Sequence, residues 1–349
     1  MFQFMRTYFR LLAEDREKGD LSKVIYPLLD VLSWLYGGIV ALLRNLYDRK
    51  VFKRQRLPFP VISVGNLTWG GTGKTPLVEY LAIKVSEQRR TPLILTRGYG
   101  HDEVEQFRNH LPNAVLGVGK DRASVGKKII KGRRIDVGIL DDGLQHWKVE
   151  RDVEIIVVNA INPFGNRKLI PRGILREPLS VLKKATIVVL TYVNLASPKE
   201  VHHLTRMIQK FAPKAFIVES ALEPLFFYRA DRRKKVSLDR LQNHRVATFS
   251  GVATPRSFQM LLSQCQIRPT RNFEFTDHHV FTQEELEEIK GVSESSAVDE
   301  IVTTEKDFFR SPEVITRILN PLVLATRVRI LSGEEILTDR LFRLLGVTR

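Results

Sequence analysis

The sequence is poor in cysteine, in acidic side chains and in long apolar runs. Its 349 residues contain one cysteine, Cys265, which excludes an intrachain disulfide framework and a cysteine-rich zinc site. The uncharged stretch Val31–Leu43 would reach about 20 Å as a helix, whereas a bilayer core is about 30 Å thick. This stretch alone is therefore too short to span a membrane. Hydrophobic residues at 43% and charged residues at 27% exclude a disordered chain and a polytopic membrane protein.

The shortage of acids leaves the chain strongly basic. Lys and Arg number 55 against 39 Asp and Glu, which gives a net charge of +16. Such a charge attracts nucleic acid, an anionic membrane or a phosphorylated substrate, and charge alone does not choose among them. A basic collar at 44–56 follows the apolar stretch, a pattern that suits a helix in the interface of an anionic leaflet. A helix packed on the protein's own core fits the same pattern.

Short apolar runs alternate with stretches of helical pattern from about residue 60 onward. Most of these runs are continuous and rich in β-branched residues, as in strands covered on both faces. Strands that alternate with helices predict a doubly wound α/β sheet. The expected strands are Val61–Val64, Leu93–Thr96, Ala114–Val118, Val137–Leu140, Glu154–Val158, Thr186–Leu190, Val246–Ser250, Ile301–Thr304 and Leu322–Arg329.

A glycine-rich turn follows the first of these runs and leads into a helix that is expected to begin near Pro76. The turn matches the end of the P-loop pattern G-x-x-x-x-G-K-[ST], although Thr68 occupies the first glycine position. In this pattern Lys74 reaches the β- and γ-phosphates of a nucleotide and Thr75 ligates Mg²⁺. The residues expected to bind nucleotide are Gly70, Gly71, Thr72, Gly73, Lys74 and Thr75.

An acidic pair, Asp141 and Asp142, ends another apolar run. Acids at the carboxyl end of a parallel strand lie where open α/β sheets bind ligands, and they are typical of the second metal-binding motif of P-loop proteins. In a continuing strand only one of the two would face the phosphates, whereas a turn admits both. Gln145 and His146 follow at the same edge.

These patterns predict three parts. Residues 1–56 form an N-terminal interfacial helix with its basic collar, and residues 57–225 form a P-loop nucleotide-binding domain. Residues 226–349 form a smaller α/β domain, which follows a change of texture near Phe226 and an exposed basic cluster at 229–235.

Several short stretches keep one order between about residues 60 and 310. They are Gly65–Pro76, Arg97–Gly100, Val118–Arg122, Leu140–His146, Asn162–Gly165, Leu175–Pro178, Asp277–His279 and Thr304–Asp307. Together they resemble the tetraacyldisaccharide 4'-kinase family of lipid A biosynthesis. That family tolerates threonine at the position of Thr68.

The resemblance implies an enzyme that uses ATP and Mg²⁺. It would transfer the γ-phosphoryl group to the 4'-hydroxyl of a tetraacyl glucosamine disaccharide 1-phosphate and give the bis-phosphorylated precursor lipid IVA. It also implies a peripheral or monotopic protein on the cytoplasmic face of the bacterial inner membrane. Its partners would be the anionic glycolipid and the membrane surface, with no nucleic acid and no obligate protein partner.

The resemblance also carries roles onto single residues. Asp102 would be the catalytic base and His278 its partner, with Lys74 as the third catalytic residue. Metal ligands would come from Thr75, Asp141, Asp142 and Glu177. Gln145, His146, Arg176 and Glu305 would line the cleft. The sequence departs from the family before Asp102, because only His101 separates it from Gly100 and because histidine replaces a glycine there.

Two other functions fit part of the pattern. A P-loop kinase or ATPase that acts on a soluble small molecule would need neither lipid nor the N-terminal helix. A nucleotide-dependent module that binds nucleic acid would explain the net charge, but it predicts aromatic residues interleaved with the basic ones. Aromatics do not recur through both the 44–56 and the 229–235 clusters.

Overall fold

The computed structural model of the chain describes residues 20–98, 100–232 and 234–347. The first nineteen residues of the predicted N-terminal part lie outside this range. So do Tyr99, which belongs to the Arg97–Gly100 motif, and Arg233, which belongs to the basic cluster at 229–235.

The chain divides into two compact units, and each unit is assembled from separate stretches of sequence. Unit 1 comprises the chain up to Arg97, Leu111–Ala221 and the stretch from Ile330 onward, whereas unit 2 comprises Gly98–His110 and Leu222–Arg329. The sequence prediction used one continuous stretch for each domain. In the structure, the helix that carries Asp102 lies in unit 2.

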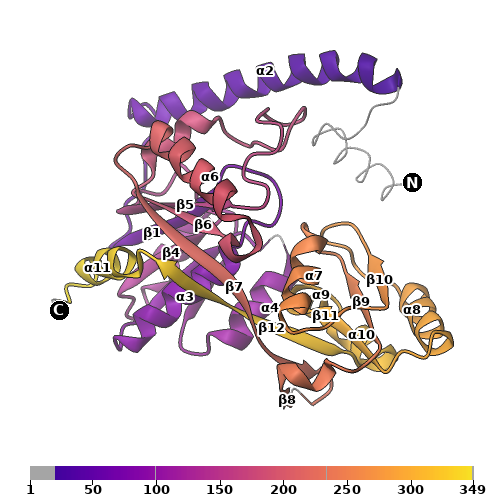
Figure 1. The fold of residues 1–349 in the computed structure, drawn as a ribbon. Helices are drawn as coiled ribbons and strands as arrows, with labels where there is room; N and C mark the ends of the chain where they lie inside the picture. The colour runs from indigo at the N-terminus through magenta and orange to yellow at the C-terminus, as the bar shows by residue number, and fades with distance from the viewer. Residues whose placement is uncertain (1–19, 99, 233, 348–349) are drawn as a thin grey trace. The chain divides into compact units, whose positions relative to one another are not determined.

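Unit 1 is built on parallel strands in the order β7-β6-β5-β1-β4-β2-β3. Every residue of β1, β2, β4, β5 and β6 is buried, because helices pack on both faces of the sheet (Figure 1). The strands are β1 (Val61–Asn66), β2 (Pro92–Thr96), β3 (Val115–Val118), β4 (Val137–Asp141), β5 (Val153–Asn159), β6 (Ile187–Thr191) and the first part of β7 (Phe216–Arg229).

The parallel register brings the carboxyl ends of the central strands to one edge. Val64 lies opposite Asp141 in the β1–β4 pair, and Asn159 lies opposite Thr191 in the β5–β6 pair. Asn66, the last residue of β1, lies opposite Val157 of β5. Polar residues at the ends of four neighbouring strands therefore meet, at the edge where open α/β sheets bind ligands.

The helices of unit 1 place their apolar stripes on this sheet. In α6, the buried residues Val201, Leu204 and Ile208 recur every three or four positions and pack with residues of β5 and β6. A capping box at Ser197 fixes where α6 begins. Besides the N-terminal helix, the helices are α3 (Lys74–Glu87), α5 (Arg122–Ile129), α6 (Pro198–Phe211), α11 (Glu334–Leu344) and the short 3-10 helices η1 (Leu179–Lys184) and η2 (Val193–Leu195).

The long helix α2 (Asp20–Asp48) lies along the outside of unit 1 (Figure 1). At about 44 Å it is longer than the predicted segment Val31–Leu43. Leu29, Ser33 and Val40 are buried on one face, whereas large apolar side chains such as Trp34, which is 76% exposed, lie on the other. In the described part of the chain, α2 is the one helix long and apolar enough to cross a membrane, and its part Ile25–Asp48 has a mean hydropathy of 1.6.

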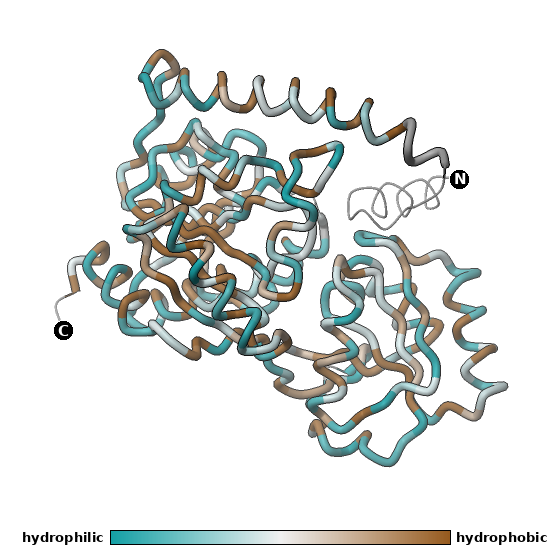
Figure 2. The backbone as a smooth tube through the Cα atoms, turned by 45° about the horizontal axis from the view of Figure 1, so that its top comes forward, coloured by the Kyte–Doolittle hydropathy of each residue, from teal (hydrophilic) through white to brown (hydrophobic). Residues whose placement is uncertain are grey.

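Unit 2 is a smaller sheet in the order β10-β9-β11-β12-β7, with β8 antiparallel to β7. Apolar side chains of α7 cover one of its faces and those of α8 to α10 the other, and Figure 2 shows apolar residues along the inner strands of each unit. Its elements are α4 (His101–His110), β8 (Lys235–Val236), β9 (Val246–Ser250), α7 (Pro255–Gln264), β10 (Arg271–Glu274), α8 (Gln283–Ser295), β11 (Glu300–Thr304), α9 (Glu305–Arg310), α10 (Pro312–Ile318) and β12 (Leu322–Ser332).

The predicted fold class, a largely parallel α/β sheet with a smaller α/β part and an N-terminal apolar helix, is confirmed. Each predicted strand is present, with ends that differ by a few residues. The sequence prediction missed β7, β8 and β10. It also missed that β7 and β12 each contribute residues to both units.

Candidate functional site

The predicted phosphate loop joins the end of β1 to the start of α3. Gly70 and Gly73 have φ angles of 109° and 79°, which glycine adopts without strain. Three side chains at the sheet edge hold the loop's carbonyl groups. Asn66 Nδ2 donates to Thr68 O at 2.8 Å, Asn159 Nδ2 to Gly71 O at 3.1 Å, and Thr191 Oγ1 to Thr72 O at 2.8 Å. Gly73, the N-cap of α3, has no side chain that could cap the first amide groups of the helix. Uncapped amide groups at the start of a helix are suited to bind an anion.

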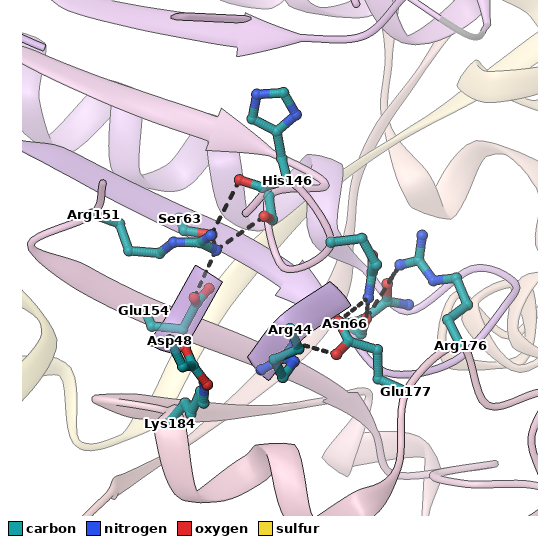
Figure 3. A network of polar contacts seen from close by, with 12 residues as sticks. Arg44, Asp48, Ser63, Asn66, His146, Arg151, Glu154, Arg176, Glu177 and Lys184 are labelled. Atoms are coloured by element: carbon teal, nitrogen blue, oxygen red, sulfur yellow. Dashed lines mark hydrogen bonds and ion pairs between the residues drawn. The ribbon is translucent and has the colours of Figure 1, made fainter. Parts of the chain in front are cut away.

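Two cationic side chains converge on Asp142. Arg176 binds both carboxylate oxygens of Asp142, at 2.8 and 2.9 Å, and Lys74 Nζ lies 3.5 Å from Asp142 Oδ1. Asn66 contacts both cations. Its Oδ1 accepts hydrogen bonds from Lys74 and from Arg176 (Figure 3). Burial alone would raise the pKa of Asp142, but the charges of Lys74 and Arg176 outweigh it and hold the pKa far below its ordinary value. The cluster is a ready site for further negative charge.

The acidic pair forms a turn, as one of the two sequence readings allowed. β4 ends at Asp141, and Asp142 has a φ of 50°, so the strand does not continue. Asp141 Oδ2 accepts a hydrogen bond from Thr96 Oγ1 at 3.2 Å, and its buried Oδ1 has no hydrogen-bond partner among the described residues. Burial raises the pKa of Asp141, and the neighbouring Asp142 raises it further. An added cation beside this pair would relieve both effects.

These donors fit Mg²⁺. Within the described ranges, no three His, Cys, Asp or Glu side chains gather as a protein-only metal site. Mg²⁺ usually takes one or two carboxylates and fills its other positions with water and substrate phosphates. The unpartnered oxygen of Asp141, the adjacent Asp142 and Thr75 in the first turn of α3 supply that kind of donor set.

Glu177 and Gln145 extend the cluster from a neighbouring segment. Gln145 Nε2 donates to Asn66 O at 3.1 Å and to Glu177 Oε1 at 3.2 Å. Glu177 is fully buried and forms an ion pair with Arg44 of α2. Burial raises the pKa of Glu177, and Arg44 opposes that rise. The structure thus places the carboxylate of Glu177 between Arg44 and Gln145, whereas its predicted role as a metal ligand stays a prediction.

Two arginines, to which the sequence prediction gave no role, donate hydrogen bonds to carbonyl groups of Asp142 and of the loop that follows it. Arg122 Nη1 donates to Asp142 O at 3.0 Å. Arg151 donates to Gly143 O at 3.1 Å and to His146 O at 3.1 Å (Figure 3). Burial, with added repulsion from both arginines, lowers the pKa of His146 to about 4, so its ring is neutral at neutral pH.

Asp102 lies in unit 2, in the first turn of α4, with a side chain that is 1% exposed. Its Oδ2 accepts a hydrogen bond from Arg310 Nε at 2.9 Å and lies 3.9 Å from His278 Nδ1. Its Oδ1 is buried and has no hydrogen-bond partner in the described part of the chain. A Cβ at position 100 would lie 2.0 Å from this oxygen, so the glycine before α4 leaves room for the carboxylate. Arg310 therefore holds one oxygen, and the other is left without a hydrogen-bond partner among the described residues.

Arg310 connects the segments around Asp102. Its Nη1 donates to Gly251 O at 2.8 Å and to Asp307 Oδ1 at 2.9 Å. His278 N donates to the same carbonyl, Gly251 O, at 3.1 Å. Arg310 thus binds the carboxylate of Asp102 directly and shares the carbonyl of Gly251 with the backbone of His278.

Sequence reasoning identified the members of both clusters but not their supports. The structure brings Lys74, Asp142, Gln145, Arg176 and Glu177 into one network. It places Asp102 beside His278, and it pairs Glu305 with His110 at 3.1 Å. It missed five supporting residues, because each binds either a residue distant in the sequence or a backbone carbonyl group. They are Arg44, Arg151, Asn159, Thr191 and Arg310.

The profile of the family described as tetraacyldisaccharide-1-P 4'-kinase matches residues 25–345 of the chain. A protein of Arabidopsis thaliana described as a probable mitochondrial tetraacyldisaccharide 4'-kinase is 35% identical over 329 residues, which cover 84% of this chain and 83% of the relative. The tetraacyldisaccharide 4'-kinase of Halothermothrix orenii is 30% identical, over 87% of each chain. That of Anaeromyxobacter sp. strain K is 33% identical, over 86% of each chain.

A solved structure has the same fold. It is the crystal structure of LpxK from Aquifex aeolicus in complex with ATP, with which the chain shares a TM-score of 0.70 and 27% sequence identity. The similarity covers 92% of this chain and 99% of the other.

Proposed function

The chain belongs to the tetraacyldisaccharide 4'-kinase family, and we infer how its own residues carry out that family's reaction. It is an ATP-dependent kinase of lipid A biosynthesis that phosphorylates a lipid A precursor at the 4'-hydroxyl. The observation that carries the assignment of roles is the convergence of Lys74 and Arg176 on Asp142 beside the glycine-rich loop. This is the charge pattern that a bound triphosphate and its metal require.

The phosphate loop would hold the phosphates of ATP. Backbone amides at the start of α3 bind phosphate oxygens, and Lys74 and Arg176 neutralise the charge that builds up during transfer. Thr75, Asp141 and Asp142 would hold Mg²⁺, which supplies charge neutralisation on the transferred and leaving groups. When ATP binds, its phosphate oxygens would replace Asp142 as the partners of Lys74 and Arg176, and Asp142 would be free to bind Mg²⁺.

Asp102 would accept the proton. Its free Oδ1 takes the proton of the sugar 4'-hydroxyl as the hydroxyl oxygen bonds to the γ-phosphorus, and the bond from that phosphorus to the β,γ-bridging oxygen breaks to release ADP. Arg310 holds the carboxylate of Asp102 in place through its hydrogen bond to Oδ2. His278 Nδ1 lies 3.9 Å from Oδ2, beyond hydrogen-bond distance, and would have to move closer to orient the carboxylate or share its proton.

The acceptor would be a tetraacyl glucosamine disaccharide 1-phosphate, and the product lipid IVA. The exposed apolar side chains of α2 and the basic residues at 44–56 suit a helix that lies in the interface of an anionic leaflet. The opposite face of α2 is bound to unit 1, from Asp30 to Asp48, which favours a monotopic association over a span. The cytoplasmic face of the bacterial inner membrane is the surface where such a substrate and ATP would meet.

Family membership disfavours the alternative of a kinase for a soluble small molecule. The test is incubation with γ-labelled ATP, Mg²⁺ and the tetraacyl disaccharide 1-phosphate in detergent micelles. We expect the label to appear on the lipid, at the 4' position. Label that appears only on a soluble amino sugar offered in parallel, or release of phosphate with no labelled lipid, would refute the assignment.

A further inference from the structure

Helix α2 is bound to segment 169–177, which carries Arg176 and Glu177 into the cluster around Asp142. Ser33 Oγ donates to Leu169 O at 2.8 Å and accepts from Arg172 N at 2.9 Å. Tyr36 OH donates to Arg176 O at 2.8 Å. The contacts of α2 therefore run along this segment from Leu169 to Arg176, the residue that binds Asp142.

Arg44, two turns beyond Tyr36 on the same face of α2, forms the ion pair with Glu177 (Figure 3). Side chains of α2 thus hold two adjacent residues from the outside, one by its carbonyl group and the other by its carboxylate. From the inside, Arg176 binds Asp142, and Glu177 accepts from Gln145.

The ion pair is not a loose surface contact. Glu177 is 0% exposed and the Arg44 side chain is 11% exposed, so water does not screen the attraction well. Glu154 lies nearby and repels Glu177. Removal of one member of a buried pair leaves an uncompensated charge, which the structure relieves by moving that charge toward water. Movement of Glu177 would carry with it Arg176, its neighbour in the chain.

We propose that α2 is part of the nucleotide-binding machinery, with Arg44 and Tyr36 as positioning residues that hold the Arg176–Glu177 dipeptide where Arg176 can bind phosphate. The role of α2 as a membrane contact does not require this, since its apolar face points the other way. The proposal rests on the proposed function, because it concerns the same ATP site. It predicts that α2 affects ATP affinity when no lipid is present.

The test measures ATP affinity of the full chain by calorimetry, in one detergent, with EDTA and without lipid substrate. Arg44→Gln should weaken ATP binding by about 10- to 100-fold, by analogy with the loss of a group that orients a metal ligand. Tyr36→Phe, which removes one hydrogen bond, should weaken it about fivefold. Arg44→Lys keeps the charge and should recover most of the affinity.

Arg49→Gln is the matched control. Arg49 is exposed just beyond α2, and its loss removes the same charge from the basic collar. It should leave ATP affinity unchanged. If Arg44→Gln binds ATP as tightly as Arg49→Gln does, the proposal is wrong, and the Arg44–Glu177 pair serves only to attach α2.

Thermal melting shows whether each variant is folded. Should Arg44→Gln fail to fold, Tyr36→Phe decides, and unchanged ATP affinity in that variant overturns the proposal. Failure of the proposed function is a separate result, because it would appear as no lipid phosphorylation by the wild-type chain. Failure of the positioning role would appear as normal ATP affinity in variants of a chain that does phosphorylate the lipid.

Discussion

Each unit contains an arginine bound to an aspartate, and the two pairs differ in how open they are. In unit 1 the side chains of Arg176 and Asp142 are 21% and 36% exposed. In unit 2 those of Arg310 and Asp102 are 5% and 1% exposed. A ligand can reach and separate the first pair, whereas the second pair is held together inside unit 2. The first pair is therefore suited to exchange partners during binding, and the second to stay together throughout the reaction.

This difference suggests a division of labour. The unit 1 cluster handles negative charge, so its loss should weaken nucleotide binding and transfer together. The unit 2 cluster handles a proton, so its loss should slow turnover and leave ATP binding intact. Comparison of ATP affinity with kcat in variants of each unit tests the division directly.

Lys74→Ala should have the largest effect. Lys74 is one of two cations that converge on the predicted phosphate site, and its loss removes charge stabilisation from both the bound nucleotide and the transition state. We expect kcat/KM for ATP to fall at least about 10³-fold, together with a clear loss of ATP affinity. Lys84→Ala, a change at another lysine of α3, is the control. Normal transfer by Lys74→Ala would remove the phosphate-loop assignment.

Asp102→Asn should stop proton acceptance without affecting the nucleotide. We expect kcat to fall about 10²- to 10³-fold while the ATP dissociation constant stays within about twofold of the wild-type value. Rapid-quench measurement of lipid phosphorylation and calorimetry of ATP binding provide the two numbers. Glu105→Gln, in the same helix, should match the wild type. A parallel loss of ATP affinity in Asp102→Asn would break the division between the units.

The sheet could be read from the sequence where its strands are buried on both faces. Continuous apolar runs such as Ile187–Thr191 have few other structures available to them. β7 was missed because its buried and exposed residues are mixed and because it contains Glu219, Glu223 and Pro224, which resemble a break. Its role in the sheet is set by its neighbours and not by its own pattern.

The candidate site could be predicted only where its functional residues lie next to one another in the sequence and form a recognisable motif. The glycine-rich loop with Lys74 and the Asp141–Asp142 pair are of this kind. Asp102 and His278 were singled out by resemblance alone, since isolated acids and histidines are common. The supports were beyond reach because Arg310 lies 208 residues from Asp102 and Arg44 lies 133 from Glu177. Such pairings exist only once the chain has folded.

Arg310→Gln should have a smaller effect than loss of the base itself. It removes the charge that holds Oδ2 of Asp102 and leaves the carboxylate in place. We expect kcat to fall about 10- to 100-fold with ATP affinity unchanged, and Arg310→Lys to recover much of the rate. In an Asp102→Asn background, Arg310→Gln should cost little more, because the oriented group is already gone. If the losses of kcat from the two substitutions are additive, Arg310 does not act through Asp102 and affects only stability. Thermal melting of Arg310→Gln, compared with Arg317→Gln at another arginine of unit 2, measures that effect on stability.

His278 provides the smallest and most specific test. Burial lowers its pKa below the ordinary value, and the charges of Lys306 and Arg310 lower it further, against the opposite influence of Asp277 and Asp102. The ring is therefore neutral at neutral pH. If the neutral ring is needed beside the carboxylate, activity falls as the pH drops through this lowered pKa.

Lys306→Gln removes one of the charges that lower the pKa of His278. It also frees Asp277, which lies 3.9 Å from Lys306 and 3.8 Å from His278 Nε2, to favour the protonated ring. Both changes raise the pKa, so the acidic limb of the kcat/KM profile should move to higher pH, with the rate well above that limb unchanged. An NMR titration of His278 should move in the same direction, and Lys290→Gln, at an exposed lysine of α8, should move neither. An acidic limb that stays in place while the NMR pKa rises would show that the protonation state of His278 does not limit the reaction, and the proton would then belong to Asp102 alone.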